Sequence, residues 1–176
     1  MRSRSSPAGF TLIELLVVLI LVGLLASLAV FTLGGSQQRQ LERAVQDLYL
    51  LMGTASEQAV LNNLELGLKL DPDGYRFLVY QDDDGSWQPS SERLFEPRTF
   101  PEGLVLVYDI DNEAPKLTSA SQGDRLVPDI VFFSSGETTP FRLEFTVGQD
   151  TEGMHVLASD GITGVRWHKP GESEED

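Results

Sequence analysis

Glu14 is the one charged side chain inside a long apolar run of this sequence. The run extends from Phe10 to Leu33 and contains no other Asp, Glu, Lys or Arg. A carboxylate within hydrocarbon is costly, and a neighbouring cation relieves that cost, so this position favours charge pairing. Alternatively, Glu14 lies in the first turn of a helix, where the helix dipole stabilises an anion without a partner. Taken alone, Glu14 fits both interpretations.

The other residues that could do chemistry do not form a catalytic set. The sequence has two histidines, His155 and His168, and no cysteine. A nucleophile triad needs a Ser or Cys with a positioned His and an acid, and no serine stands in a nucleophile-elbow sequence. The sequence also lacks a glycine-rich phosphate loop and a His-Glu-x-x-His pattern. We therefore expect a protein that is not an enzyme and has no cofactor.

The acidic stretch Asp82-Asp83-Asp84-Gly85 offers oxygen ligands of the kind that calcium prefers. An EF-hand loop counted from Asp82 would close at Arg93, which is not acidic and cannot complete the site. The same residues also suit an exposed acidic turn. We expect the turn and no metal site.

The net charge argues against a nucleic-acid partner, and the absence of cysteine excludes disulfides and thiolate metal sites. The formal net charge is -14, from 13 Lys and Arg against 27 Asp and Glu. Such an acidic balance repels phosphate backbones, so we expect no nucleic-acid partner. The absence of cysteine excludes a disulfide framework and a thiolate metal site.

The segment that carries Glu14 has the length of a membrane helix. About 20 mostly apolar residues cross a bilayer, and we expect residues 10–35 to do so. A secretory signal peptide has a shorter apolar core, whereas an ordinary signal anchor fits the length but leaves Glu14 unexplained. Arg2 and Arg4 precede the run, and the other acidic residues follow it. The positive-inside rule therefore predicts a cytoplasmic N-terminus and an exported C-terminal part.

A second, amphipathic helical segment is predicted over residues 36–63. Apolar residues recur there at steps of three and four: Leu41, Ala44, Val45, Leu48, Leu51, Met52, Ala55 and Ala59. Charged residues fall between them, so the helix has one apolar face. We expect it to continue the membrane helix and to pack on a globular head.

The head, residues 64–170, is predicted to consist of strands. Residues 66–70 and 75–80 form a hairpin in which Gly74 takes the turn position that tolerates a positive φ. Residues 104–108 are apolar on both faces, as in a central strand, whereas 141–147 alternate as in a half-buried one. Further strands are expected over 130–133, 154–158 and 162–167, with loops over 81–101 and 109–122. One long helix followed by strands predicts an α+β fold, and the acidic tail 171–176 should be disordered.

The residues around Glu14 resemble the N-terminal signal of type IV pilins and pseudopilins. The matching residues are Gly9-Phe10-Thr11-Leu12-Ile13-Glu14-Leu15-Leu16-Val17-Val18. The resemblance implies that a prepilin peptidase removes the basic leader 1–9 by cutting after Gly9, and that Phe10 is then N-methylated. It also implies that Glu14 pairs with the free amine of an adjacent subunit and sets the register between subunits.

A second resemblance lies in the head. Residues 132–143, with Gly136, Thr139, Pro140 and Phe141, are similar to the strand-loop-strand of GspH/FimT-type minor pilins. Without the resemblance, these residues fit a plain hairpin: Gly136 permits a turn, and Pro140 starts a strand where no amide donor is needed. The resemblance implies a pilin-like head in which two antiparallel sheets pack on the long helix.

Together these resemblances imply a minor pseudopilin of a type II secretion system. Its expected partners are other pseudopilins, the prepilin peptidase, inner-membrane lipid and the inner-membrane assembly platform. The expected location is the bacterial inner membrane in a single pass, with the head periplasmic. A minor pilin of a type IV pilus, of the FimT/FimU kind, is an alternative, although the acidic balance and the missing cysteines argue against it. A membrane-anchored exported enzyme or binding domain is a third interpretation.

Overall fold

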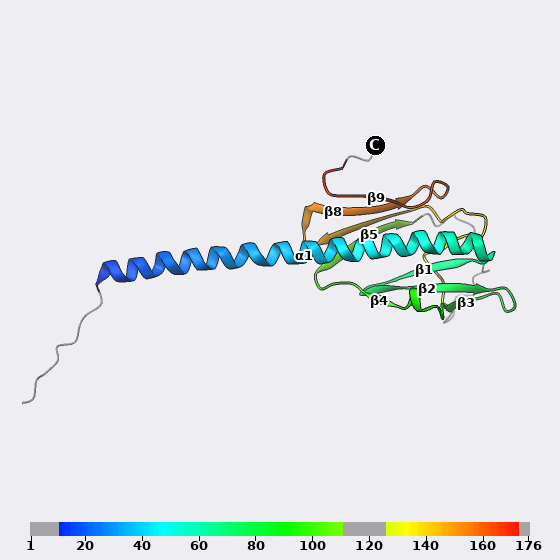
Figure 1. Cartoon of the computed structure of the whole chain (residues 1–176), viewed down its shortest axis with the longest axis horizontal. Helices are drawn as coiled ribbons and strands as arrows, with labels where there is room; N and C mark the ends of the chain where they lie inside the picture. Colours follow the sequence, from blue (N-terminus) through cyan, green and yellow to red (C-terminus); the bar gives the residue numbers. More distant parts are fainter. Residues whose placement is uncertain (1–10, 111–125, 173–176) are drawn as a thin grey trace, which may run out of the picture. The chain divides into compact units, whose positions relative to one another are not determined.

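The computed structural model describes residues 11–110 and 126–172, and gives only the backbone for residues 25–34 (Figure 1). The chain forms two compact units, Met1–Gln37 and Gln38–Asp176. One helix, α1 (Leu12–Asn62), contributes residues to both. Gly9 and Phe10, most of the loop predicted over 109–122, and the acidic tail from residue 173 on lie outside the described residues.

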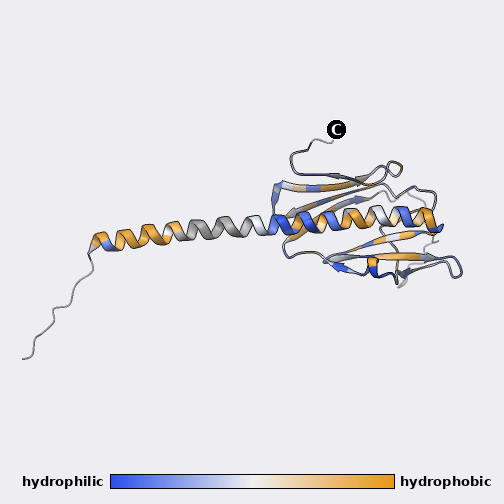
Figure 2. Cartoon of the chain, in the orientation of Figure 1, coloured by the Kyte–Doolittle hydropathy of each residue, from blue (hydrophilic) through white to orange (hydrophobic). Residues whose placement is uncertain are grey.

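In the first unit, residues 12–24 of α1 are almost entirely apolar (Figure 2). Leu, Val and Ile fill residues 12–24 apart from Glu14 and Gly23, and long unbranched or γ-branched side chains such as Leu lose little freedom in a helix. Among the residues whose side chains are described, no helical segment meets the length and hydropathy of a membrane span.

In the second unit, α1 has the amphipathic character predicted from its sequence. One face is buried, and it carries Leu41, Val45, Leu48, Met52, Ala55 and Ala59. The spacing of three and four residues places these side chains on one side of the helix. The helix ends at Asn62, and Asn63 follows in the left-handed region with φ 52°. There the Leu64 amide donates to the Ala59 carbonyl over 3.1 Å, which satisfies one of the last carbonyls of the helix.

Two antiparallel sheets complete this unit. The first has the order β3-β2-β1-β6, with β4 also paired to β2; its strands are β1 (Leu66–Asp71), β2 (Gly74–Gln81), β3 (Ser86–Pro89), β4 (Arg98–Thr99) and β6 (Ile130–Phe132). The second has the order β5-β7-β8-β9, formed by β5 (Leu104–Ile110), β7 (Phe141–Val147), β8 (Asp150–Ser159) and β9 (Arg166–His168). A short 3-10 helix, η1 (Arg93–Phe95), precedes β4. The predicted α+β fold, a long helix with two antiparallel sheets, is confirmed.

A single hydrophobic core joins α1 to both sheets. Leu68 and Phe77 enter it from the first sheet, and Leu143 and Phe145 from the second; each is at most 1% exposed. Figure 1 shows the C-terminal part of α1 running along both sheets. Burial of each such side chain contributes about 1.5–3 kcal/mol, so this shared core holds the second unit together.

The prediction that residues 104–108 form a central strand is wrong. β5 pairs only with β7 among the described strands and is therefore an edge strand. Val105 and Val107 are 42% and 59% exposed. Although β5 has apolar residues on both faces, it is not buried in the middle of its sheet.

The prediction for Gly74 is also wrong. The turn between β1 and β2 consists of Pro72 and Asp73, and Gly74 already pairs with Asp71 as the first residue of β2. Its φ is not in the left-handed region. Glycine is needed there for space, because a Cβ at this position would collide with the carbonyl oxygen of Arg98 in β4.

Two further boundaries differ from the predictions. The segment 81–101, predicted as loop, contains β3, η1 and β4; β3 places Trp87, 6% exposed, against Tyr80 with ring centroids 5.3 Å apart. The last predicted strand, 162–167, is β9, which begins only at Arg166, whereas β8 begins earlier than predicted, at Asp150.

Candidate assembly interface

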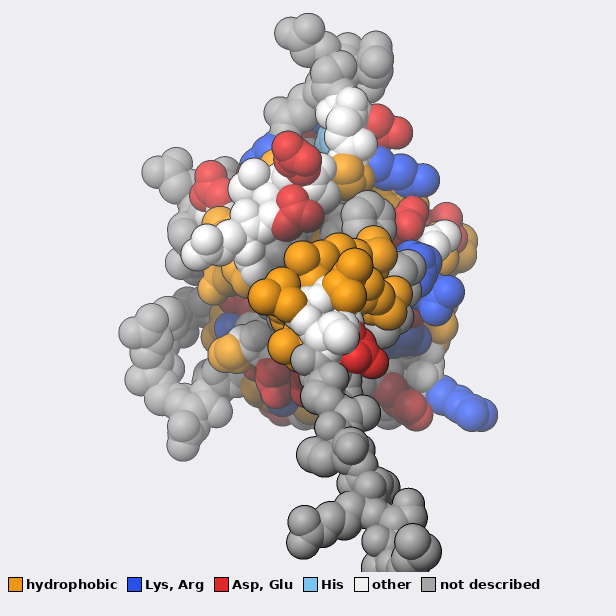
Figure 3. All heavy atoms as spheres, turned by 90° about the vertical axis from the view of Figure 1, so that its left-hand side faces the viewer, with side chains coloured by type: hydrophobic (Ala, Val, Ile, Leu, Met, Phe, Trp, Pro, Cys, Tyr) orange, Lys and Arg blue, Asp and Glu red, His pale blue; other side chains and the backbone are white. Residues whose placement is uncertain are grey.

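The first unit presents an apolar surface on all sides of α1. Within residues 12–24, eleven large hydrophobic side chains are 48% exposed or more: Leu12, Ile13, Leu15, Leu16, Val17, Val18, Leu19, Ile20, Leu21, Val22 and Leu24. Successive residues of a helix point about 100° apart, so this nearly unbroken run covers the whole circumference. Figure 3 shows hydrophobic side chains gathered around the end of α1 that faces the viewer. A helix that is apolar all round is one whose surface is covered by lipid or by other helices.

Glu14 lies in the first turn of this helix and is exposed. Its backbone amide donates to the Thr11 carbonyl over 3.1 Å, which fixes the start of the helix. No described residue forms an ion pair with its carboxylate. The structure therefore places Glu14 at a helix N-terminus within an apolar surface, where both the dipole and a cation from outside the described chain can act on it.

The four head-motif residues form the connection between the two sheets. Gly136 takes φ 94°, and its amide donates to the Phe133 carbonyl over 2.9 Å. Thr139 bonds Val131 twice: its amide donates to the Val131 carbonyl over 2.9 Å, and its hydroxyl accepts from the Val131 amide over 3.1 Å. Pro140 then precedes Phe141, which starts β7 and is 5% exposed in the core. These contacts give the motif a role in tying β6 to β7.

Among the described residues, neither histidine forms a catalytic pair with an acid or a nucleophile. His155 is 3% exposed, and its Nδ1 accepts a hydrogen bond from Trp167 Nε1 over 3.3 Å. Burial lowers the pKa of His155; Glu42 raises it and Lys169 lowers it further, both by smaller amounts. His168 lies in β9, where its backbone is in register with Val156 of β8. Sequence reasoning noticed His155 only as part of a strand. The alternation along 141–147, continued across the hairpin, would have placed it on the inner face.

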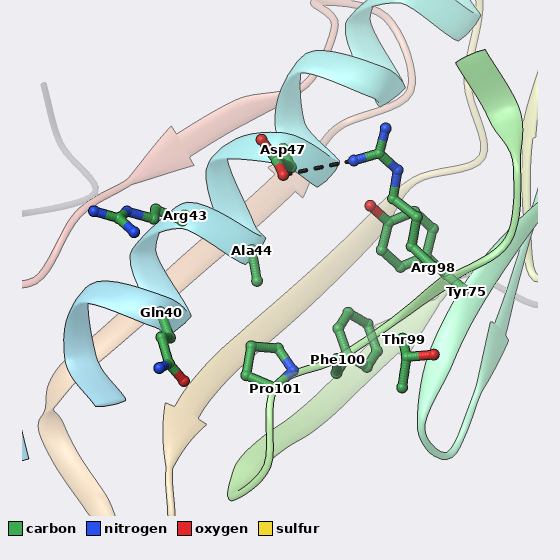
Figure 4. A pocket seen from close by; sticks show the side chains of 9 residues that line it. All are labelled: Gln40, Arg43, Ala44, Asp47, Tyr75, Arg98, Thr99, Phe100 and Pro101. Carbon is green, nitrogen blue, oxygen red and sulfur yellow. Dashed lines mark ion pairs between the residues drawn. The ribbon is translucent and has the colours of Figure 1, made fainter. Parts of the chain in front are cut away.

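A hollow of about 340 Å³ lies between α1 and the segment that contains β4 (Figure 4). Its lining includes Gln40, Asp47, Tyr75, Arg98 and Phe100. Arg98 and Asp47 form an ion pair of 3.5 Å at the surface, with side chains 41% and 60% exposed, so the pair contributes little to stability. Burial raises the pKa of Tyr75 to about 12, which keeps its hydroxyl neutral. The hollow holds no nucleophile with a base beside it.

The acidic stretch 82–85 forms the turn between β2 and β3. Asp84 Oδ1 accepts hydrogen bonds from the amide of Ser86 over 3.0 Å and from its hydroxyl over 2.6 Å. Gly85 follows with φ 64°. Within residues 11–110 and 126–172, no group of three or more His, Cys, Asp or Glu side chains is arranged to hold a metal ion.

Comparisons with protein families match two different parts of the chain. Residues 44–161 match the family described as Type II transport protein GspH. Residues 4–30 match the prokaryotic N-terminal methylation motif. The first match covers the head with the end of α1, and the second covers the apolar run and its basic start.

Individual relatives agree with the GspH match. The chain is 35% identical to the type II secretion system protein H of Pseudomonas aeruginosa over 162 residues, which cover 88% of this chain and 91% of that protein. It is 30% identical to the protein of the same name from Vibrio cholerae, over 98% of this chain and 100% of the relative. The crystal structure of the minor pseudopilin EpsH from V. cholerae superposes with a TM-score of 0.64 at 25% identity, over 78% of this chain and 99% of that one.

Proposed function

Because the chain belongs to the GspH family and is a minor pseudopilin of the type II secretion system, we propose that it acts as a membrane-anchored filament subunit whose assembly depends on Glu14. The observation that carries the proposal is the occurrence, in one chain, of a GspH head and an N-terminal methylation motif. Of the functions expected from the sequence, the pseudopilin is the one that the relatives' names support, in place of the type IV pilus subunit.

Residues 10–35 anchor the subunit in the inner membrane in this proposal. The apolar run has the length that a bilayer requires, and its basic start favours a cytoplasmic N-terminus with the head in the periplasm. A prepilin peptidase removes residues 1–9 after Gly9, and Phe10 becomes the methylated N-terminus. The match to the methylation motif supports this processing.

In this proposal, Glu14 then sets the axial register between the helices of neighbouring subunits. Cleavage after Gly9 creates a cationic amine four residues before Glu14, and the amine of an adjacent subunit can approach the carboxylate. A single buried charge in hydrocarbon is costly, whereas a paired carboxylate and ammonium relieve each other. The exposed apolar side chains of residues 12–24 would be covered by neighbouring helices and by lipid. The charge pair thereby favours one axial position of two neighbouring helices.

The head works mechanically in this proposal and catalyses no reaction. The described residues hold no nucleophile with a positioned base, and the buried His155 faces Trp167. The subunit joins the pseudopilus through contacts with other pseudopilins and with the inner-membrane assembly platform. Movement of the assembled pseudopilus then helps to export folded proteins across the outer membrane.

The proposal is tested by Glu14→Leu in cells that lack the native gene. The variant removes only a polar cost from the apolar run, so we expect normal membrane insertion. Export of a folded exoprotein should fall at least about 10-fold, because an unpaired amine left in the assembled fibre costs on the order of 3 kcal/mol. The matched control is Val17→Leu, which changes an exposed apolar side chain of the same helix and keeps the charge. Equal export by both variants would refute the register role of Glu14.

A further inference from the structure

β9 lies at the outer edge of the second sheet and is held there by few backbone contacts (Figure 1). Among the described strands it pairs only with β8, where its register partners are Val156, Leu157 and Ala158. Two side chains of this segment, Val165 and Trp167, are half-buried and pack against the shared core. A segment with so short a ladder opens more easily than the strands in the middle of a sheet.

The Trp167 side chain makes the contacts that hold β9 against the rest of the head. Its ring lies 5.8 Å from the ring of Tyr49 in α1, measured between centroids. Its Nε1–H donates to Nδ1 of His155 in β8 over 3.3 Å, and His155 is 3% exposed. Lys169 Nζ lies 4.9 Å from the centroid of the Trp167 ring. Of these partners, only the histidine changes its charge in mild acid.

Protonation of His155 removes its hydrogen bond with Trp167. Protonated imidazole carries a proton on both nitrogens, so Nδ1 would face the Trp167 N–H with a proton of its own. Burial also opposes the charged ring and lowers the pKa of His155 below its ordinary value of 6.5. Among the described residues, the charged groups that act on this histidine are Glu42 of α1, which raises its pKa, and Lys169, which lowers it. Phe145, the register partner of His155 in β7, has no charge.

Release of β9 would change the surroundings of a protonated His155 in its favour. Lys169 follows β9 directly and would move away with it, so the repulsion between Lys169 and the protonated ring would end. Glu42 belongs to α1 and would remain, so its attraction would be kept. Water would reach the ring and stabilise its charged form further. Protonated His155 is therefore more stable when β9 is released than when β9 is bound.

Gly164 gives the segment a point at which the chain can turn. Its φ is 81°, and no other part of the head lies within 4 Å of the position that a Cβ would occupy. Glycine adopts positive and negative φ with similar ease, so this residue can change conformation at little cost. Just before it, the Asp160 carboxylate accepts hydrogen bonds from the amides of Ile162 and Thr163 over 2.9 and 2.8 Å. This turn can stay intact while the chain after Gly164 moves.

We propose that the segment from Val165 to Lys169 is a pH-sensitive latch, the β9 latch, which protonation of His155 releases from β8 and α1 while the rest of the head stays folded. Release uncovers the backbone edge of β8 and the side chain of Leu157, which is fully buried while β9 is bound. The pKa of His155 is lowered in the bound form, so the latch is closed above pH 6.5 and loosens as the pH falls from 6.5 toward the lowered pKa. The β9 latch belongs to the head alone and does not depend on the proposed role of Glu14.

Hydrogen exchange measured by mass spectrometry tests the β9 latch on the full-length chain in detergent micelles. Amide exchange is compared between about pH 7.5 and about pH 5, after correction for the intrinsic effect of pH on exchange. Protection of the peptide that contains β9 should fall on the order of 10-fold, because the released form becomes more populated. Protection of the β7 peptide should stay unchanged over the same range. Equal protection of β9 at both pH values, or a parallel loss in β7, would overturn the inference.

Two glutamine substitutions identify the responsible histidine. His155→Gln keeps an acceptor for the Trp167 N–H but does not titrate, so the protection of β9 should lose its pH dependence. His168→Gln is the matched control: it makes the same change within β9, next to Trp167 and therefore on the opposite face of the strand, and should keep the pH dependence. Persistence of the dependence in His155→Gln, or its loss in His168→Gln, would contradict the latch. The comparison of β9 with β7 uses only the unsubstituted chain, so it decides the question even where a variant folds poorly.

Discussion

Two ionisable residues of this pseudopilin show how position decides what a charge can do. Glu14 is exposed within an apolar surface, so its carboxylate is available to a cation of another molecule. His155 is 3% exposed and accepts a hydrogen bond from Trp167 within its own head, so it is committed to the fold. An accepting Nδ1 requires the neutral ring with its proton on Nε2. The carboxylate of Glu14 is therefore free for the assembly contact that we propose, whereas His155 stabilises the attachment of β9.

The protonation of His155 should make the head less stable in mild acid. Burial lowers its pKa below the ordinary 6.5, so the unfolded chain binds a proton that the folded head resists. The free energy of unfolding should therefore decrease as the pH falls from 6.5 toward the lowered pKa, and level off below it. Protonation would also turn Nδ1 into a donor facing the Trp167 N–H. Urea denaturation of the head, followed at several pH values by tryptophan fluorescence, measures this dependence.

The control for this prediction is His155→Gln. It should cost about 1 kcal/mol near neutral pH through the altered contact with Trp167, and it should remove most of the decrease between pH 6.5 and the lowered pKa. Glu42 and Lys169 also face this histidine with opposite effects on its pKa, and both remain in the variant. An unchanged pH dependence in His155→Gln would assign the effect to other groups.

At the scale of elements, close approach between strands decides where glycine is required. Gly74 begins β2 where β4 pairs with it, and Thr99 is its register partner. A Cβ there would collide with the Arg98 carbonyl oxygen, which is backbone and cannot swing aside. Gly53 lies in α1 with nothing within 4 Å of its missing Cβ. Both glycines lie inside regular elements, but only Gly74 is required by lack of space.

Alanine substitutions should separate these two cases. Gly74→Ala should lower the free energy of unfolding by about 1–3 kcal/mol, because β4 must move away from β2. Gly53→Ala should raise it by about 0.5–1 kcal/mol, because alanine has a higher helix propensity and meets no neighbour. Chemical denaturation of both variants beside the unsubstituted chain provides the comparison. A stabilising Gly74→Ala would show that β4 does not lie as close to β2 as described.

The sequence was sufficient to predict elements whose pattern lies within the element itself. It was insufficient where the structure depends on pairing with a distant strand. The alternation along 141–147 predicted β7 and its buried residues, and the three- and four-residue spacing predicted the buried face of α1. The position of β5 at a sheet edge depends on which distant strand it joins, and residue type alone does not carry that information. The role of Gly74 was missed for the same reason, since β4 lies more than 20 residues later in the chain.

At the scale of the whole molecule, the chain divides its tasks between two units. Unit Gln38–Asp176 contains the shared hydrophobic core and both sheets, whereas unit Met1–Gln37 contains the exposed apolar surface with Glu14. The methylation motif of the first unit could be recognised from the sequence, because a charge within an apolar run is a local pattern.

The central claim is that a freshly cut N-terminus supplies the cation for Glu14, and the mature N-terminus of the working protein tests it most directly. The chain is purified from secreting cells with and without prepilin peptidase, and its N-terminal peptide is analysed by mass spectrometry. With the peptidase, the account predicts a peptide that begins at N-methylated Phe10; without it, the peptide should retain residues 1–9 and export should stop. An unprocessed chain beginning at Met1 in cells that still export normally would contradict the account.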